Sequence, residues 1–274
     1  MQRRKFVQRL SATALFLLSN GVGKTTNAKY FRQNAILRFA VTSDGHYGEP
    51  GTSFESNFNN VVNAINDFHA AQPFEFSVIN GDIIHNNPDF LLPASKLLKQ
   101  CKMPFYVTKG NHDMVSPERW METWGMGINH DVVLGENVLL LGTTADETGK
   151  YLCPDQEWFT AKLEQHKSAK NIFIFLHITP VKWTKHAVDC QPFQKLLQNA
   201  KNVRAVFNGH DHDQDGIKFL GNVPFLFDGH FGGSWGTAYQ GFRVVELLED
   251  NSLLTYMMDP HQKLAELNIY RQNA

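Results

Sequence analysis

Short apolar runs alternate with amphipathic stretches along most of the chain. Residues 36–41, 73–82, 104–113, 171–180 and 203–212 each contain an apolar run with the length of a strand, ending in polar residues. The run NIFIFL at 171–176 is continuously apolar, which is typical of a strand covered on both faces. Between the runs, residues 58–68 carry apolar side chains at helical spacing. We therefore predict strands that alternate with helices.

Further elements follow the same reasoning. Helices are expected at 90–100, 155–166 and 190–200, and a hairpin at 132–143. Residues 114–130 form a loop with some helical character, and the tail contains consecutive strands at 223–230, 241–248 and 252–258. Strands and helices in alternation, followed by a strand-rich end, predict an α/β fold with mixed sheets. The sequence contains no internal repeat, and residues 28–274 are expected to form one domain.

The first 27 residues have the pattern of an export signal. Arg3 and Arg4 are followed by Phe6 and by a short apolar run at 10–18, which resembles a twin-arginine signal. That run is far shorter than the roughly 20 residues needed to span a bilayer, so no transmembrane anchor is expected in the mature chain. The alternative is a flexible basic tail. We expect an exported protein, periplasmic or extracellular.

Nearby, GVGKTT at 21–26 ends like a phosphate-binding loop. Leu18 stands where that loop needs glycine, and no strand precedes it, so we reject a nucleotide-binding role for this segment.

The composition of the chain limits which classes of binding partner are expected. The 274 residues have a formal net charge of −1, so no overall basic field favours nucleic acid or an anionic membrane. The oligomeric state is left open. Three cysteines allow at most one disulfide, and we interpret them as mostly buried or incidental. Twelve histidines are generous for one chain, and several follow apolar runs.

Five of the predicted strands end in clusters of polar residues. The clusters read SDGH, NGD, GNHD, a histidine after FIFL, and NGHDH, and they supply these side chains: Asp44 and His46; Asp82; Asn111, His112 and Asp113; His177; His210 and His212. Ligands in open α/β sheets gather at the carboxyl ends of strands. Each cluster alone has an ordinary explanation, a turn or a core histidine, but together they predict a single site.

The residue types indicate which chemistry that site performs. Imidazole suits zinc and iron, carboxylate and amide oxygens suit harder ions, and no cluster contains a thiolate. More than four candidate ligands favour two metal ions over one. A single-zinc amide hydrolase would leave Asp44, Asp82 and Asn111 without a role.

In this order, SDGH, NGD, KGNHD, LHITP and NGHDH resemble the calcineurin-like metallophosphoesterase family, over roughly residues 36–258. The resemblance implies a four-layer α/β/β/α sandwich with two mixed sheets. It also implies two metal ions, manganese, iron or zinc, the first held by Asp44, His46 and His212 and the second by Asn111, His177 and His210. Asp82 would bridge both ions, and a water or hydroxide between them would attack phosphorus.

The same resemblance implies that His112 is the general acid or a contact to the phosphoryl oxygen, and that Asp113 orients it. The small cyclic-nucleotide phosphodiesterase-like branch is the most similar, so we expect hydrolysis of a small phosphodiester, a cyclic nucleotide being one candidate. A broad phosphomonoesterase and a non-catalytic, metal-containing binding module are the alternatives.

Substrate contacts are less well defined by the sequence. Trp183 and His230 are candidates, and His85 is at most a rim or supporting residue. The segment 114–131, which carries Trp120 and Trp124, is a candidate wall of the pocket. The alternative for these three tryptophans is a place in the core.

Overall fold

The computed structural model describes residues 35–269, and both the predicted export signal and the rejected phosphate loop lie outside that range. The first sheet is mixed and has six strands, in the spatial order β12-β11-β10-β1-β2-β3. Their bounds are β12 Gln262–Ile269, β11 Leu253–Asp259, β10 Phe242–Leu248, β1 Ala35–Thr42, β2 Phe76–Asn80 and β3 Phe105–Thr108. Strands β1, β2 and β3 run parallel, whereas β10, β11 and β12 continue the sheet in antiparallel pairs.

A second six-stranded mixed sheet has the order β4-β5-β6-β7-β9-β8. Its strands are β4 His130–Leu134, β5 Asn137–Gly142, β6 Asn171–Leu176, β7 Val203–Asn208, β9 Val223–Phe227 and β8 Ile217–Leu220. The four central strands run parallel, and β4 and β8 close the edges in antiparallel pairs. The predicted hairpin at 132–143 is therefore confirmed as β4 and β5.

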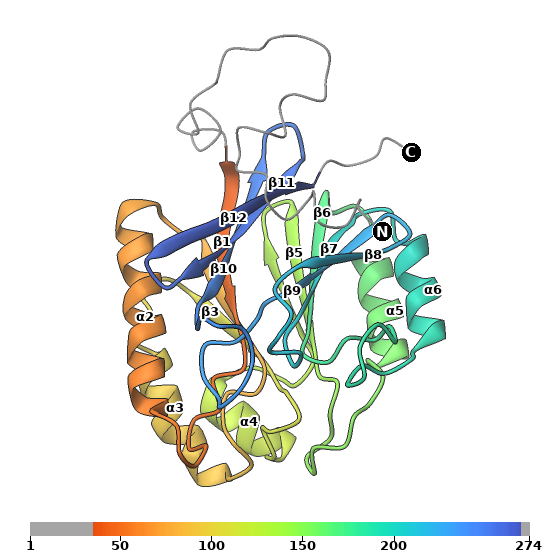
Figure 1. Ribbon diagram of the computed structural model, residues 1–274. Coiled ribbons are helices and arrows are strands. Elements are labelled where there is room, and N and C mark those ends of the chain that lie inside the picture. The colour runs from red at the N-terminus through yellow and green to blue at the C-terminus, as the bar shows by residue number, and fades with distance from the viewer. Residues whose placement is uncertain (1–34, 270–274) are drawn as a thin grey trace, which may run out of the picture.

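The two sheets pack face to face, and helices cover both outer faces (Figure 1). Phe39 of β1 lies at the centre of the inter-sheet core, in ring contact with Phe173, Phe175 and Phe207 of the second sheet. Helices α2 Phe54–Ala71, α3 Leu91–Leu98 and α4 Pro117–Trp124 cover the first sheet. Helices α5 Gln156–Gln165 and α6 Gln191–Asn199 cover the second. The predicted four-layer α/β/β/α sandwich is thus confirmed.

Trp120 and Trp124 belong to the core. Both lie on α4, are buried, and pack in the apolar cluster between the first sheet and its helices. Of the two interpretations of residues 114–131, the structure supports the core one for these two side chains.

The cysteines differ from the sequence-based interpretation. Cys153 and Cys190 form a disulfide, whereas Cys101 is free and half-buried. The bridge ties the loop after β5 to the residue that precedes α6. Two of the three cysteines are therefore not incidental, and the sequence could not show this because the pair is 37 residues apart and has no motif.

Candidate metal centre

All five polar clusters directly follow parallel strands. The clusters begin where β1, β2, β3, β6 and β7 end, so their turns lie at the same end of the two sheets. Hydrogen bonds join neighbouring turns: the amide of Asp44 donates to the carbonyl of Gly81, and that of His46 to the carbonyl of Asp82. The convergence predicted from the sequence is therefore observed.

The turns hold their functional residues in an unusual backbone conformation. Four of the predicted ligands, Asp44, His46, Asp82 and His210, have φ between 46° and 67°. Left-handed backbone costs a non-glycine residue on the order of 1–2 kcal/mol, and such strain gathers at functional sites. Gly110 allows a close approach of the backbone to a ligand, because a Cβ there would lie 2.2 Å from Oδ1 of Asp82.

Six of the predicted ligands fall into two groups. Within each group the candidate ligand atoms all lie within 4.8 Å of one another; the groups are Asp44, His46 and His212, and Asp82, His177 and His210. Nε2 of His212 is 3.0 Å from Oδ1 of Asp44, and Nε2 of His177 is 3.1 Å from Oδ2 of Asp82. The two groups correspond to the two ions that the resemblance implies.

Asp82 lies between the groups. Its Oδ2 is 3.1 Å from Nε2 of His177 in one group and 3.7 Å from Nε2 of His46 in the other. The other oxygen, Oδ1, accepts the backbone N–H of His112 at 2.7 Å. The carboxylate of Asp44 is held in the same way, with Oδ2 accepting the backbone N–H of His210 at 2.9 Å. Each carboxylate is thus fixed through one oxygen, while the other faces the ligand cluster.

The histidine rings are oriented through their second nitrogens. Nδ1 of His177 donates to the carbonyl of Asn80 at 2.7 Å, and Nδ1 of His212 donates to the carbonyl of Trp235 at 3.1 Å. Nε2 of each ring is consequently the atom that carries the lone pair toward the site. Such outer hydrogen bonds are the usual way in which metal-binding imidazoles are oriented.

Unpaired buried atoms test whether these residues suit metal ions. In the described part of the chain, the buried side-chain atoms that have no hydrogen-bond partner include Oδ1 of Asp44, Oδ1 of Asn111, Nε2 of His177 and Nε2 of His210. Buried polar atoms are rarely left unpaired, so four in one cluster indicate a missing partner. All four are lone-pair donors, and all belong to predicted ligands, so the residues fit the metals.

The electrostatics point in the same direction. Burial lowers the pKa of His46 and His210 to about 3, which keeps both rings neutral. Burial would also lower the pKa of His177, but the carboxylates of Asp82 and Asp44 outweigh it and raise that pKa to about 10. The neighbouring carboxylates thus favour positive charge at Nε2 of His177, a position where a proton and a metal ion compete.

His112 is oriented by a residue that differs from the predicted one. Its Nδ1 lies 2.7 Å from Oδ1 of Asn86, and the amide of Asn86 donates back to the carbonyl of His112 at 2.9 Å. The carboxylate of Asp113 instead accepts the backbone N–H groups of Ile84 and Gly110, both at 2.9 Å. Asp113 therefore braces the turns that carry Ile84 and Gly110. The hydrogen bond between Asn86 and Nδ1 of His112 leaves Nε2 as the ring nitrogen available to a substrate.

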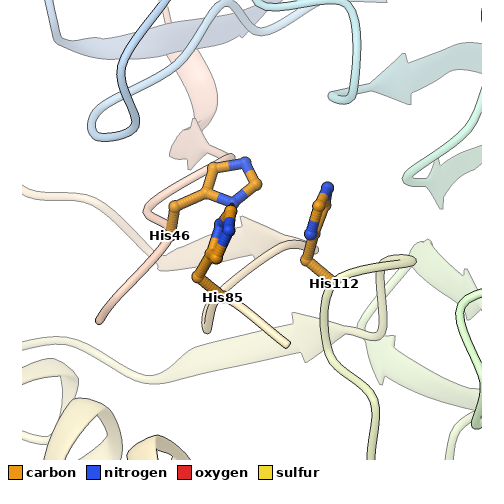
Figure 2. A group of neighbouring side chains, drawn as sticks. All are labelled: His46, His85 and His112. Atoms are coloured by element: carbon orange, nitrogen blue, oxygen red, sulfur yellow. Dashed lines mark hydrogen bonds between the residues drawn. The ribbon is translucent and has the colours of Figure 1, made fainter. Parts of the chain in front are cut away.

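His85 joins the site at its border. Nδ1 of His85 lies 3.2 Å from Nδ1 of His46, and its ring stacks on that of His112 with centroids 4.9 Å apart. Figure 2 shows the three rings as neighbours, and each pair of ring centroids is 4.8 to 5.3 Å apart. His85 also lines the cavity that opens onto the cluster, so it combines the rim and supporting positions considered for it.

A cavity of about 380 Å³ opens onto the cluster. Besides ligand-group residues, His85 and His112, it is lined by Glu49, Tyr151, Lys185, His186 and Trp235, which were not among the residues predicted from the sequence. None of these has a motif. The one feature of the sequence that could have indicated a role was Trp235, a tryptophan within the glycine-rich stretch 229–236.

The two predicted substrate contacts, Trp183 and His230, are not among the described residues that line this cavity. Among the described residues, those lining the cavity do not include Trp183, whose ring packs edge-on against Phe225 of β9. His230 is buried, stacks on His212, and lies 2.5 Å from the carbonyl oxygen of Gly232. His230 thus supports the loop that borders this cavity, and together with Trp235 it lines a neighbouring cavity of about 580 Å³.

The sequence match establishes the family. Residues 37–214 match the family model described as calcineurin-like phosphoesterase, and the chain belongs to this family of metal-dependent enzymes that hydrolyse phosphoric esters. Its metal-binding candidates include the two groups that contain Asp44 and Asp82, and His46, His85 and His112 form a third group with ligand atoms equally close together. No curated protein matches the chain by sequence.

Solved structures share the fold. A dimetal phosphatase from Danio rerio is 13% identical, with a TM-score of 0.68 over 87% of this chain and 100% of its own. GAP50, the anchor in the inner membrane complex of Plasmodium, is 15% identical, with a TM-score of 0.65 over 86% and 89%. The calcineurin-like phosphoesterase YfkN from Bacillus subtilis is 14% identical, with a TM-score of 0.51 over 86% and 90%. Within residues 35–269, no helix is long and apolar enough to cross a bilayer.

Proposed function

We propose that this protein hydrolyses a small phosphodiester at a centre of two metal ions. The observation that supports this most strongly is the pair of ligand groups that meet at Asp82, beside an open cavity. Asp44, His46 and His212 would hold one ion, and Asn111, His177 and His210 the other, with Asp82 between them. Manganese, iron and zinc all suit imidazole and carboxylate ligands.

The two ions, when bound, would lower the pKa of a water and neutralise charge on the phosphoryl oxygens. The chain supplies the proton transfer. The Asn86 acceptor on Nδ1 of His112 leaves Nε2 to face the cavity, where a protonated imidazole can donate to the departing ester oxygen. One P–O ester bond breaks, the oxygen of water takes its place on phosphorus, and the alcohol leaves with the proton from His112.

The first experiment compares a chromogenic phosphodiester with its monoester after chelation and after adding manganese, iron or zinc. Asp82→Ala should abolish turnover, because it removes the shared carboxylate. Asp213→Ala is the matched control, since this exposed aspartate follows His212 but lies outside both ligand groups, and it should retain activity. Turnover that survives in Asp82→Ala would refute the two-metal assignment.

The same assay separates the alternatives. A preference for the monoester would replace the diesterase proposal with a broad phosphomonoesterase. A chain that binds two ions yet turns over neither ester would favour a binding module, although such a module has no need of the oriented His112. One bound ion per chain would favour the single-zinc hydrolase.

We also propose that the protein is exported. Arg3, Arg4 and the short apolar run are one reason, and the Cys153–Cys190 disulfide is another, because disulfides persist mainly in oxidising compartments. Fractionation of cells that express the full chain should place it outside the cytoplasm. Replacing Arg3 and Arg4 with lysine should retain it inside, and cytoplasmic location of the unaltered chain would contradict the proposal.

A further inference from the structure

Trp235 is a large aromatic side chain held at the mouth of the catalytic cavity. Its indole lies parallel to the ring of His212, with centroids 4.3 Å apart and an angle of 6° between the planes. One face is therefore covered by a predicted metal ligand. The residue is nevertheless 46% exposed, so the opposite face carries the exposed ring surface, and Trp235 lines both the cavity above the cluster and a neighbouring cavity of about 580 Å³.

Hydrogen bonds on both sides of this residue fix its position. The carbonyl of Trp235 accepts from Nδ1 of His212, and the hydroxyl of Ser234 donates to Oε1 of Glu49 at 2.6 Å. The amide of Thr237 donates to the carbonyl of His212 at 3.0 Å. A flat ring held this way needs little further ordering to bind a second flat ring, and preorganisation of this kind favours binding.

The indole is close enough to the reaction centre to contact the substrate. The cavity that Trp235 lines is also lined by Asp82, His112 and His210, so one small ester can touch both places. The ring of His186 lies 5.7 Å from that of His210 and 6.2 Å from the indole, and would border a group resting on Trp235. The family match ends at residue 214, so this platform is not part of the matched region.

We propose that the ester substrate carries a flat aromatic group of the nucleobase kind, which stacks on the open face of Trp235. This inference rests on the proposed function, because it places phosphorus at the centre beside His212 and the base beyond the indole. Stacking of a base on an aromatic side chain is sequence-tolerant and strong enough to select for the base.

The test uses two diesters that differ only in the base: the methyl esters of adenosine monophosphate and of ribose phosphate. The unaltered, metal-loaded protein should hydrolyse the adenosine ester with a kcat/KM about tenfold higher. Trp235→Leu should bring the ratio of the two kcat/KM values to within about twofold of one, and Trp235→Phe should retain part of the preference. The ratio cancels any general loss of activity, because both esters react at the same bond.

Phe219→Leu is the control. Phe219 is 53% exposed on β8 and is absent from the described lining of the cavity, so its loss should leave the ratio unchanged. A ratio near one in the unaltered protein, or a ratio that Trp235→Leu does not change, would overturn the inference.

A binding measurement separates this inference from the proposed function. Calorimetry would give Kd values for the phosphonate analogues of adenosine monophosphate and ribose phosphate, which are not hydrolysed. Tighter binding of the adenosine analogue, by about tenfold and lost in Trp235→Leu, would support the platform even if neither ester is turned over. Equal Kd values for the two analogues would overturn it whatever the turnover.

Discussion

At the scale of single residues, the site depends on which ring nitrogen of each histidine carries the proton. His177 and His212 donate from Nδ1 to backbone carbonyls, whose positions are set by the fold itself. His46 has a side-chain partner instead, Nδ1 of His85. If Nε2 of His46 binds metal, its Nδ1 carries the proton and His85 must accept it. Burial and the nearby His112 lower the pKa of His85, which keeps that ring neutral and able to accept.

His85→Ala is therefore expected to weaken metal binding without removing a ligand. The loss of an outer hydrogen bond typically reduces metal affinity by about 10- to 100-fold. His85→Gln, which can place an amide oxygen near Nδ1 of His46, should lose less. The measurement is the metal dissociation constant by calorimetry, with metal content after dialysis as a second readout.

His261→Ala is the matched control for a lost histidine, because His261 is exposed and belongs to neither ligand group. An affinity in His85→Ala equal to that of this control would contradict the role assigned to His85.

The orientation of His112 gives a second prediction at this scale. Asn86→Gly removes the acceptor, and glycine tolerates the φ of 63° found there. We expect kcat to fall by roughly tenfold or more, because a misdirected ring loses part of the gain from general acid catalysis, with KM changed little. Asn86→Asp keeps an acceptor and should retain most of kcat. Similar kcat values in Asn86→Gly and the unaltered enzyme would show that Asn86 does not orient His112.

At the scale of elements, strands and the ends of strands could be predicted, whereas contacts between loops could not. SDGH, NGD and NGHDH each place ligands directly after a strand, so the local sequence fixes where Asp44, Asp82 and His210 lie. The Asn86–His112 bond joins turns 26 residues apart, and the Trp235–His212 stack joins the NGHDH cluster to a segment that no motif marks. Edge strands β8 and β12 were also missed, because short or half-polar strands carry weak patterns.

The disulfide gives a prediction at the scale of elements. Cys153 lies two residues after Tyr151, and Cys190 lies four residues after His186, so the bridge links two segments that line the cavity. Cys153→Ser together with Cys190→Ser should lower the stability of the fold by about 2–4 kcal/mol. It should also raise KM more than it lowers kcat, since the nearest predicted metal ligand along the chain, His177, is 13 residues before Cys190.

Thermal unfolding and steady-state kinetics would measure both effects, and Cys101→Ala is the control because Cys101 is free. An unchanged KM in the double variant would show that the bridge stabilises the fold without shaping the cavity mouth.

At the scale of the whole molecule, the metal centre lies where the two sheets meet. Asp44, His46 and Asp82 follow strands of the first sheet, and His177, His210 and His212 follow strands of the second. Both ligand groups draw on both sheets, so each ion would link one sheet to the other. The carboxylates of Asp44 and Asp82 are buried in this interface, and the neighbouring histidines outweigh the effect of burial and lower the pKa of both.

Metal removal should therefore lower the stability of the entire fold and not only its activity. Each ion bound by the folded chain and not by the unfolded one adds about 2.7 kcal/mol at a concentration one hundred times Kd. For a domain of this size, each ion therefore contributes roughly 5–10 °C to the difference in Tm between the chelated and the metal-loaded protein. Asp82→Ala should show a much smaller response to added metal, because the variant lacks the shared carboxylate. Hydrogen exchange should locate the effect, since chelation is expected to increase exchange at turns of both sheets together. A Tm that does not respond to chelation, or faster exchange confined to the turns of one sheet, would show that the ions do not link the two sheets.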